Sequence, residues 1–375
     1  MIENNMKALL FFLPFLCMGA CSPKPAGSPA DELFLLVGTY TNGASKGIYT
    51  FHFNQQTGES EPLDSVALPN PSFLTVSEDH RHVYAVSEMS DSTAAINTLS
   101  FNPQDGALRW LGRQWTLGAE PCHVAANKDM VLTANYGGGS LSVFPLREDG
   151  MAAPVDTLFQ GQATGPDSLR QAVPHVHCAA FSPDGKYVFA TDFSADRILQ
   201  FAVTADGLVA LSGAAPVSLR PGTGPRHLTF APDGKHAYVI GELSGEITVF
   251  AYAAGQLTAL QTVSADTTGA QGSADIHVSP DGKFLYASNR LKEDGIAIFA
   301  VHPQDGTLAL KGYQLTGLHP RHFNLTPNGK YLLVACRDSH VIQVFERNPQ
   351  TGMLKDTGKG IPLDKPVCIV FVGKS

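Results

Sequence analysis

The strongest pattern in the chain is a set of alternating apolar and polar runs that recurs at intervals of roughly fifty residues. Its clearest copy is residues 174–203, PHVHCAAFSPDGKYVFATDFSADRILQFAV, in which a Ser-Pro-Asp-Gly turn and a polar break separate three runs. Alternation with a period of two predicts β-strands with one buried face, and Pro followed by Gly predicts a tight turn between two of them. The segment therefore predicts three consecutive strands.

The copies of this unit can be counted, and their number predicts the architecture. Seven first strands begin at Pro71, Pro121, Pro174, Pro225, Ala274, Pro320 and Pro366. A second turn signal also occurs seven times, at Asn54, Asn102, Arg147, Thr204, Ala253, His302 and Asn348. Four short strands per repeat at this period are typical of propeller blades rather than of a helical solenoid. The sequence thus predicts an all-β protein, a seven-bladed β-propeller.

The two ends of the repeat predict how the ring closes. Residues 366–372 (PVCIVFV) form a first strand with no chain left to complete a blade, whereas residues 35–53 supply further strands with no first strand before them. We expect the N- and C-terminal strands to pair within one blade, because such a joint removes the exposed edges of an open ring. The repeat runs unbroken, so residues 35–375 are predicted to form one domain.

Residues 1–21 differ in composition and predict a secretory signal. Lys7 precedes the apolar run ALLFFLPFLCMGA, which is too short to remain as a membrane-spanning helix. The run ends in MGAC, residues 18–21, which resembles a bacterial lipobox with Cys21 as the lipidated residue; an ordinary signal peptide is the alternative. Residues 22–34 then form a flexible tether. The prediction is a bacterial cell-envelope protein, lipid-anchored on the periplasmic side or at the outer-membrane face.

Composition narrows the classes of partner and chemistry. Of 375 residues only 16% are charged, and the net charge of −8 argues against nucleic acid as the main partner, although a local basic site stays open. HExxH, a P-loop and a GxGxxG after a strand are all absent from the sequence, so no motif predicts a cofactor or a metal. The remaining cysteines are expected to be buried thiols; they are Cys122, Cys178, Cys336 and Cys368.

The start of each first strand and the end of each second strand are predicted to meet at one mouth of the central channel. His123, His227 and His322 recur in three blades at one equivalent position, so we expect them to make structural hydrogen bonds between blades. His175 and His177 form an HxH pattern in one blade only, which favours a functional role over a structural or solvated pair. A metal is disfavoured there, because no third ligand occurs at a spacing typical of metal sites.

Charged side chains gather at this mouth when the repeats are aligned. They are His177, Arg226, Glu242, Arg290, Arg321 and Arg337. Arginine can bind an anionic group through two parallel hydrogen bonds, and a His or Glu beside it can move a proton. The combination predicts a small, oxygen-rich, negatively charged substrate, although each arginine taken alone fits a surface or inter-blade ion pair equally well.

Several segments carry a family resemblance. They are VGTYT at Val37, GIYTF at Gly47, ANYGGGSLSVF at Ala134, PHVHCAAFSPDG at Pro174, GPRHLTFAPDGK at Gly224, SNR at Ser288 and HPRHFNLTPNGKYLLVA at His319. Over about residues 35–372 the chain resembles the seven-bladed propeller lactonase family, which includes bacterial 6-phosphogluconolactonases of the propeller type and fungal carboxy-muconate cyclases. The resemblance implies an active site at the mouth, with the catalytic candidates His177, Arg226, Glu242 and Arg290. The residues expected to bind substrate beside them are His175, Arg321, Arg337 and Tyr136.

The resemblance also implies the reaction, which is hydrolysis of a six-membered sugar lactone to the aldonate without an obligatory metal. Water would attack the lactone carbonyl with His177 or Glu242 as base, and arginine would stabilise the oxyanion or hold a phosphate. A signal peptide separates the protein from cytoplasmic sugar phosphates, so a different physiological lactone is open. Two alternatives remain: a noncatalytic envelope propeller that binds a ligand or partner, and a carboxy-muconate cyclase-like enzyme.

Overall fold

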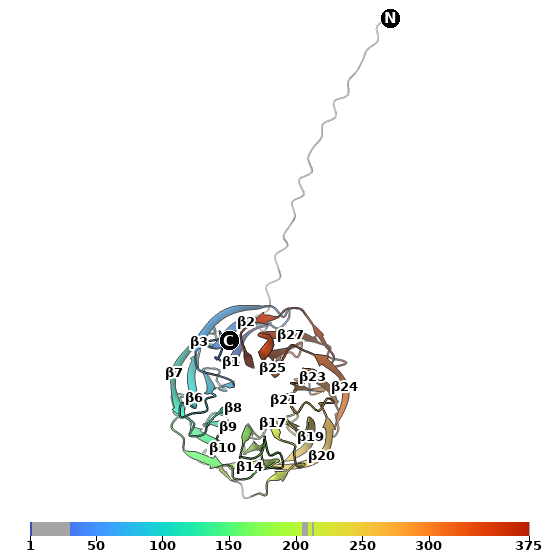
Figure 1. The fold of residues 1–375 in the computed structure, drawn as a ribbon. Coiled ribbons are helices and arrows are strands. Elements are labelled where there is room, and N and C mark those ends of the chain that lie inside the picture. Colours follow the sequence, from blue (N-terminus) through green and yellow to red (C-terminus); the bar gives the residue numbers. More distant parts are fainter. Residues whose placement is uncertain (2–30, 205–208, 212–213, 375) are drawn as a thin grey trace.

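The computed structural model describes residue 1 and residues 31–204, 209–211 and 214–374, so the predicted signal peptide and most of the predicted tether lie outside the described residues. Within the described ranges, seven antiparallel sheets form a ring around a central channel (Figure 1). The predicted seven-bladed β-propeller is confirmed. None of the described segments forms a helix that is long and apolar enough to cross a membrane.

In every blade the first strand lies at the channel and the last strand lies at the rim (Figure 1). Blade 1, from the channel outward, comprises β30 (Pro366–Gly373), β1 (Glu32–Thr39), β2 (Gly47–Asn54) and β3 (Ser60–Ala67). Blade 2 comprises β4 (Leu74–Val76), β5 (His82–Ser87), β6 (Ala95–Phe101) and β7 (Leu108–Trp115). Blade 3 comprises β8 (Pro121–Ala126), β9 (Met130–Asn135), β10 (Ser140–Pro145) and β11 (Thr157–Gln160).

The outermost strand of blades 4 and 7 consists of two short pieces. Blade 4 comprises β12 (Val176–Phe181), β13 (Tyr187–Asp192), β14 (Arg197–Val203), β15 (Val209–Leu211) and β16 (Val217–Ser218). Blade 5 comprises β17 (Pro225–Phe230), β18 (His236–Gly241), β19 (Glu246–Ala253) and β20 (Gln256–Ser264). Blade 6 comprises β21 (Ser273–Val278), β22 (Phe284–Asn289), β23 (Gly295–Val301) and β24 (Leu308–Leu315). Blade 7 comprises β25 (Pro320–Leu325), β26 (Tyr331–Cys336), the 3-10 turn η2 (Arg337–Ser339), β27 (Val341–Arg347), β28 (Leu354–Asp356) and β29 (Ile361–Pro362).

The ring closes through antiparallel pairing of β1 with β30, as the sequence predicts, with Leu33 opposite Gly373 and Gly38 opposite Cys368. The strand starts earlier than the predicted boundary at residue 35, because β1 begins at Glu32. The reason is burial: the Phe34 side chain is fully buried and its ring lies edge-on to the ring of Phe101 in blade 2, 5.6 Å away. Residues 32–34 are therefore part of the propeller and not of the tether.

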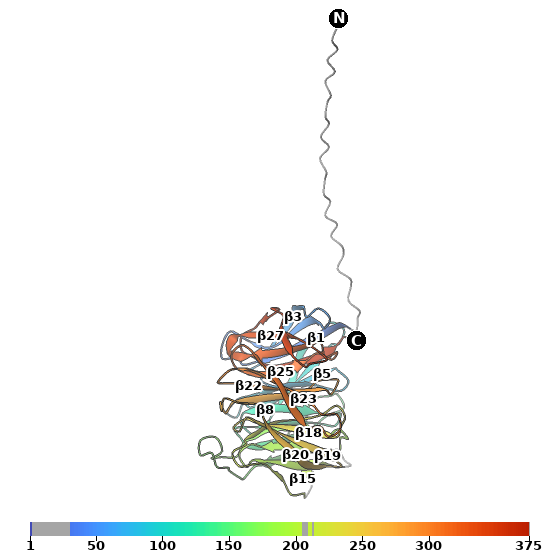
Figure 2. The ribbon, with the colours of Figure 1, turned by 90° about the vertical axis from the view of Figure 1, so that its right-hand side faces the viewer.

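The hydrophobic core lies between the faces of neighbouring blades rather than in the channel. Between blades 3 and 4, for example, Leu132 and Val143 pack with Val188 and Phe201, all of them buried. Each blade buries both faces in this way, which explains why second strands such as β9, β22 and β26 are buried at every residue. Figure 2 shows the ring edge-on, with the strands of successive blades lying one beyond another.

A hydrogen bond that recurs between blades ties them together at the end opposite the predicted mouth. A buried tyrosine of one second strand donates to the carbonyl of a glycine in the outer turn of the next blade. The pairs are Tyr84 with Gly150 (2.8 Å), Tyr238 with Gly306 (2.9 Å) and Tyr286 with Gly352 (2.8 Å). These glycines have φ values of 77°, 68° and 74°, a left-handed conformation that favours glycine over other residues. The recurrent turn signal of the sequence thus serves blade-to-blade docking.

Candidate active site

The entry to most first strands contains a β-bulge, which turns two successive side chains toward the channel. The pairing of β17 with β18, for instance, shifts register between Pro225 and His227. Arg226 consequently reaches the end of β18 while His227 lies one level deeper, and Arg226 Nη1 lies 3.3 Å from His227 Nε2. The bulges therefore build two polar layers, one at the mouth and one inside the channel.

A cavity of about 220 Å³ lies at the mouth, and we call it the mouth cavity. It is lined by three carboxylates (Glu88, Glu120 and Glu242), three arginines (Arg170, Arg290 and Arg321), and Cys122, Tyr136 and His177. Five of the predicted site residues are among them: Tyr136, His177, Glu242, Arg290 and Arg321. The lining comes from strand ends in blades 2 to 7 and from the loop that precedes β12.

The other three predicted residues lie around this cavity rather than in its wall. Arg226 lies beneath Glu242 and is almost fully buried. The imidazole of His175 stacks on the ring of Tyr136 with centroids 4.0 Å apart, and its Nδ1 lies 2.7 Å from the Tyr136 carbonyl oxygen, so His175 supports Tyr136. Arg337 lines a neighbouring cavity and is paired with Asp338.

Glu242 is the centre of a buried charge cluster. Its Oε2 lies 2.9 Å from Arg226 Nε and 3.2 Å from Arg290 Nη2, and its Oε1 lies 2.7 Å from Arg170 Nη2. Burial alone would raise the pKa of Glu242, but the charges of Arg290, Arg226 and Arg170 outweigh it and lower the pKa to about 2. At neutral pH Glu242 is therefore an ionised carboxylate with both oxygens occupied.

Two of the arginines that hold Glu242 have few N–H groups left for a ligand. Arg290 donates from Nε to the Gly272 carbonyl at 2.8 Å, and its Nη1 lies 3.2 Å from His319 Nε2. Arg226 donates from Nη1 to the carbonyl of Ala274. Burial lowers the pKa of Arg290 to about 9 despite the opposing charge of Glu242. These two arginines are part of the framework of the site.

Arg321 and Arg170 have more donor capacity. Arg321 lies over the ring of Tyr40, with its guanidinium carbon 5.3 Å from the centroid, and its Nη2 is 3.6 Å from Glu88 Oε2, beyond hydrogen-bond range. Glu88 itself is held by the Tyr40 hydroxyl at 3.0 and 3.1 Å. The side chain of Arg170 is 39% exposed; its Nη2 donates to Glu242 and to the Tyr136 hydroxyl, and its guanidinium carbon lies 5.5 Å from the centroid of the Phe193 ring. Both guanidinium groups can therefore donate hydrogen bonds to a ligand in the cavity.

His177 supplies a neutral imidazole in the cavity wall. Burial and the positive charge of Arg226 hold its pKa well below the usual value, so the ring is uncharged at neutral pH. Its Nδ1 lies 3.7 Å from the Cys122 sulfur, and the Cys122 thiol donates to the His177 carbonyl oxygen at 3.4 Å. Among the described residues, Nε2 has no hydrogen-bond partner. An uncharged imidazole has a lone pair that can accept a proton, and the lowered pKa makes this ring a weaker base than a free histidine.

Below the mouth, the recurrent histidines hydrogen-bond between blades, as the sequence predicts. His227 Nδ1 lies 2.8 Å from Asp275 Oδ1, joining blades 5 and 6. His322 Nδ1 accepts from the backbone N–H of Ile369, joining blades 7 and 1 at 3.2 Å. His123 Nε2 lies 3.5 Å from the sulfur of Cys178 in blade 4. These histidines belong to the framework under the site.

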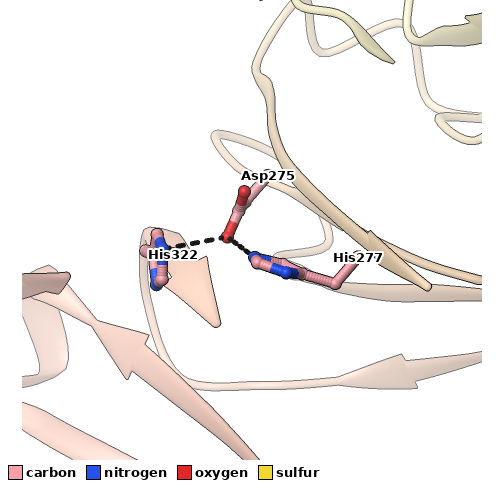
Figure 3. A group of neighbouring side chains, drawn as sticks. All are labelled: Asp275, His277 and His322. Carbon is pink, nitrogen blue, oxygen red and sulfur yellow. Dashed lines mark hydrogen bonds and ion pairs between the residues drawn. The ribbon is translucent and has the colours of Figure 1, made fainter. Parts of the chain in front are cut away.

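Asp275, His277 and His322 form a cluster with the composition of a metal site (Figure 3). One carboxylate oxygen of Asp275 lies 3.0 Å from His277 Nε2 and 3.6 Å from His322 Nε2. The hydrogen bond from Ile369 requires a lone pair on His322 Nδ1, so Nε2 of the neutral ring carries the proton and cannot ligate a metal. The cluster is therefore a hydrogen-bonded network around a buried carboxylate. Burial would raise the pKa of Asp275, but His277, His322 and His227 hold it well below its usual range.

A closed ring with an uncharged imidazole and arginine donors at one mouth defines the class of protein, a β-propeller enzyme. The chain belongs to the lactonase family of seven-bladed β-propellers, whose family model matches residues 34–371. Its mouth residues therefore belong to a fold that is used for lactone chemistry.

Individual relatives cover almost the whole propeller. The chain is 36% identical over 347 residues to the 6-phosphogluconolactonase of Bacillus subtilis, covering 90% of this chain and 97% of that one. It is 64% identical to a crystal structure from Bacteroides uniformis assigned provisionally as a 6-phosphogluconolactonase, with a TM-score of 0.90 and coverage of 91% and 100%. It is 35% identical to the periplasmic gluconolactonase of Pseudomonas aeruginosa, with a TM-score of 0.86 and coverage of 92% and 100%.

Sequence reasoning did not single out four residues of the cavity wall: Glu88, Glu120, Cys122 and Arg170. Arg170 lies in residues 161–175, between β11 and β12, outside the aligned repeat. The loop is anchored by Gln171, which is fully buried and donates to the Phe193 carbonyl at 2.9 Å. The one available signal was the length of this segment, because the interval from Pro121 to Pro174 is the longest between successive first strands.

The buried histidines predict acid-sensitive stability. Burial lowers the pKa of His227 to about 4 and that of His322 to about 3, below the value of about 6.5 in the unfolded chain. The unfolded state therefore binds protons first, so this stability is fully present above about pH 6.5 and is lost as the pH falls toward 4. We expect the free energy of urea unfolding to fall by about 1.4 kcal/mol per pH unit for each such histidine between pH 6 and 5.

A His227→Gln variant should show a shallower slope in the same titration, because one protonation is removed. The range from pH 6 to 5 lies above the titration of unfolded carboxyl groups, which isolates the histidines. A free energy of unfolding that stays constant from pH 7 to 5 in the wild-type protein would contradict the assignment.

Proposed function

We propose that the chain opens the δ-lactone of a sugar acid at the mouth cavity, in the manner of a 6-phosphogluconolactonase. The observation that carries the proposal is the neutral imidazole of His177, which shares one small cavity with the donor groups of Arg321 and Arg170. Lactone hydrolysis needs these two functions, a base for water and donors for the oxyanion. The named relatives act on gluconolactones, which supports a sugar lactone as the substrate class.

His177 serves as the base and Glu242 does not. Glu242 has a pKa of about 2 and three arginine partners, so it accepts a proton poorly. In the proposed step, His177 Nε2 takes a proton from water as its oxygen bonds to the lactone carbonyl carbon. The resulting oxyanion accepts hydrogen bonds from Arg321 or Arg170. The imidazolium then returns the proton to the ring oxygen as the carbon–oxygen bond of the ring breaks, which leaves the aldonic acid; this acid releases its carboxyl proton to water and becomes the aldonate.

The charge of the site favours a polar or anionic lactone. Four arginines and three carboxylates lie at the mouth: Arg170, Arg226, Arg290 and Arg321, and Glu88, Glu120 and Glu242. The mouth therefore has one net positive charge, although the overall charge of the protein is −8. A local positive potential attracts an anionic substrate and stabilises the developing oxyanion. It does not require a phosphate, because the oxyanion itself carries negative charge in the transition state.

Replacing His177 and His123 separately distinguishes a catalytic histidine from a framework histidine. His177→Ala should lower kcat for glucono-δ-lactone by roughly 10²- to 10⁴-fold, because the general base is lost. His123→Ala, the matched control, should lower the melting temperature and leave the kinetics of the folded fraction nearly unchanged. Acid release from glucono-δ-lactone and its 6-phosphate, recorded with a pH indicator, measures both effects.

The reverse result, with His123 essential and His177 dispensable, would show that the base is wrongly assigned. Turnover of a carboxylated muconate in place of either lactone would favour the cyclase alternative, and binding without turnover would favour a noncatalytic propeller.

For localisation we propose the cell envelope, with a lipid on Cys21 and residues 22–31 as the tether. The support is the lipobox-like sequence that ends at Cys21, together with the periplasmic gluconolactonase of Pseudomonas aeruginosa among the relatives. Cys21→Ala should release the protein from the membrane fraction of cells, since the lipidated residue is removed. Wild-type protein that is found only in the cytosol, with Met1 retained, would contradict the proposal.

A further inference from the structure

A second cavity adjoins the mouth cavity and is not needed for opening a lactone ring. It has a volume of about 430 Å³ and lies at the joint between blades 7, 1 and 2; we call it the side cavity. Its wall includes Asn42, Asn70, Glu88, Arg337, Asp338 and Lys365. The two cavities share Glu88, whose carboxylate accepts from Tyr40 on the side-cavity side and faces Arg321 on the mouth-cavity side. The two cavities therefore meet at the Glu88 side chain.

The charges of the side cavity are balanced within its own wall. Arg337 donates to Asp338 through two hydrogen bonds, Nε to Oδ1 at 2.7 Å and Nη2 to Oδ2 at 2.9 Å. Lys365 Nζ donates to the side-chain oxygen of Asn42 at 2.8 Å. A phosphate or carboxylate would compete with Asp338 for Arg337 and would face the anionic Glu88 and Asp338. A neutral ligand meets no such penalty.

The side-cavity wall presents donors and acceptors in close alternation, which suits hydroxyl groups. A hydroxyl both donates and accepts, so it can bridge an ion pair such as Arg337–Asp338 without separating the charges. The wall is also firmly held. The Asn70 amide oxygen accepts from the Thr41 backbone N–H at 2.9 Å, and its nitrogen donates to the Glu88 carbonyl at 3.3 Å. Preorganised polar groups of this kind bind a sugar ring with little ordering cost.

The volumes of the two cavities also favour a sugar ring in the side cavity. The mouth cavity of about 220 Å³ is the proposed place of one lactone ring, and the side cavity of about 430 Å³ is larger. We propose that the side cavity binds a glycosyl residue attached to the lactone, so that the preferred substrate is a glycosylated aldonolactone rather than a free or phosphorylated monosaccharide lactone. This inference rests on the proposed lactonase function and specifies its substrate class.

The test compares lactones with and without a second sugar. The wild-type protein is assayed with glucono-δ-lactone, its 6-phosphate, and the δ-lactones of maltobionic, cellobionic and lactobionic acids. We expect a higher kcat/KM for at least one of the disaccharide lactones than for either monosaccharide lactone. Asp338→Ala and Asn42→Ala should each lower the ratio of kcat/KM for that lactone to kcat/KM for glucono-δ-lactone by about three- to tenfold, mainly through KM.

Asp149→Ala is the matched control, because Asp149 pairs with Arg147 through two hydrogen bonds in the turn after β10, away from both cavities. It should leave the ratio unchanged. The inference is overturned if no disaccharide lactone has a higher kcat/KM than the monosaccharide lactones, or if both side-cavity substitutions leave the ratio of kcat/KM values unchanged. It is also overturned if Arg337→Ala selectively raises KM for the 6-phosphate, which would assign the cavity to phosphate. A protein that opens no lactone at all refutes the proposed function itself.

Discussion

One buried carboxylate makes the mouth of this propeller possible. Arg226 and Arg290 are almost fully buried at the ends of strands from different blades, and without an opposite charge such groups would strongly destabilise the ring. The negative charge of Glu242 neutralises both arginines, and its carboxylate also pairs with Arg170 from the loop before β12. The same pairing that neutralises the arginines removes Glu242 from acid–base chemistry. In the proposed mechanism, proton transfer is therefore left to His177.

Beneath this cluster a second buried carboxylate links three blades. Asp275 accepts from His227 of blade 5 and from the backbone N–H of Phe323 in blade 7, while it belongs to blade 6 itself. The mouth layer contains the residues that differ between blades, whereas this deeper layer contains histidines that recur. Arg226 connects the two layers through its contact with His227. The separation explains how a repetitive fold can carry a one-sided site.

The sequence repeat made the fold and much of the mouth predictable. Residues outside the repeat, and protonation states that depend on several segments, could not be predicted in this way. The seven turn signals and the unmatched terminal strands predicted the ring and its closure, and alignment of the strand ends brought His177, Glu242 and Arg290 to one mouth. Arg170 lies outside the repeat, so alignment could not place it. The state of Glu242 depends on three partners from separate segments, and residue type alone left it equal to His177 as a base.

In the proposed mechanism Glu242 positions arginines and His177 moves the proton. It is tested most directly by the pH dependence of kcat/KM for Glu242→Gln beside its melting temperature. We predict a less stable protein, by about 3 kcal/mol for a broken buried ion-pair cluster, whose residual activity keeps the acid limb of the wild-type profile below pH 6.5. A variant with wild-type stability and no acid limb would instead identify Glu242 as the base.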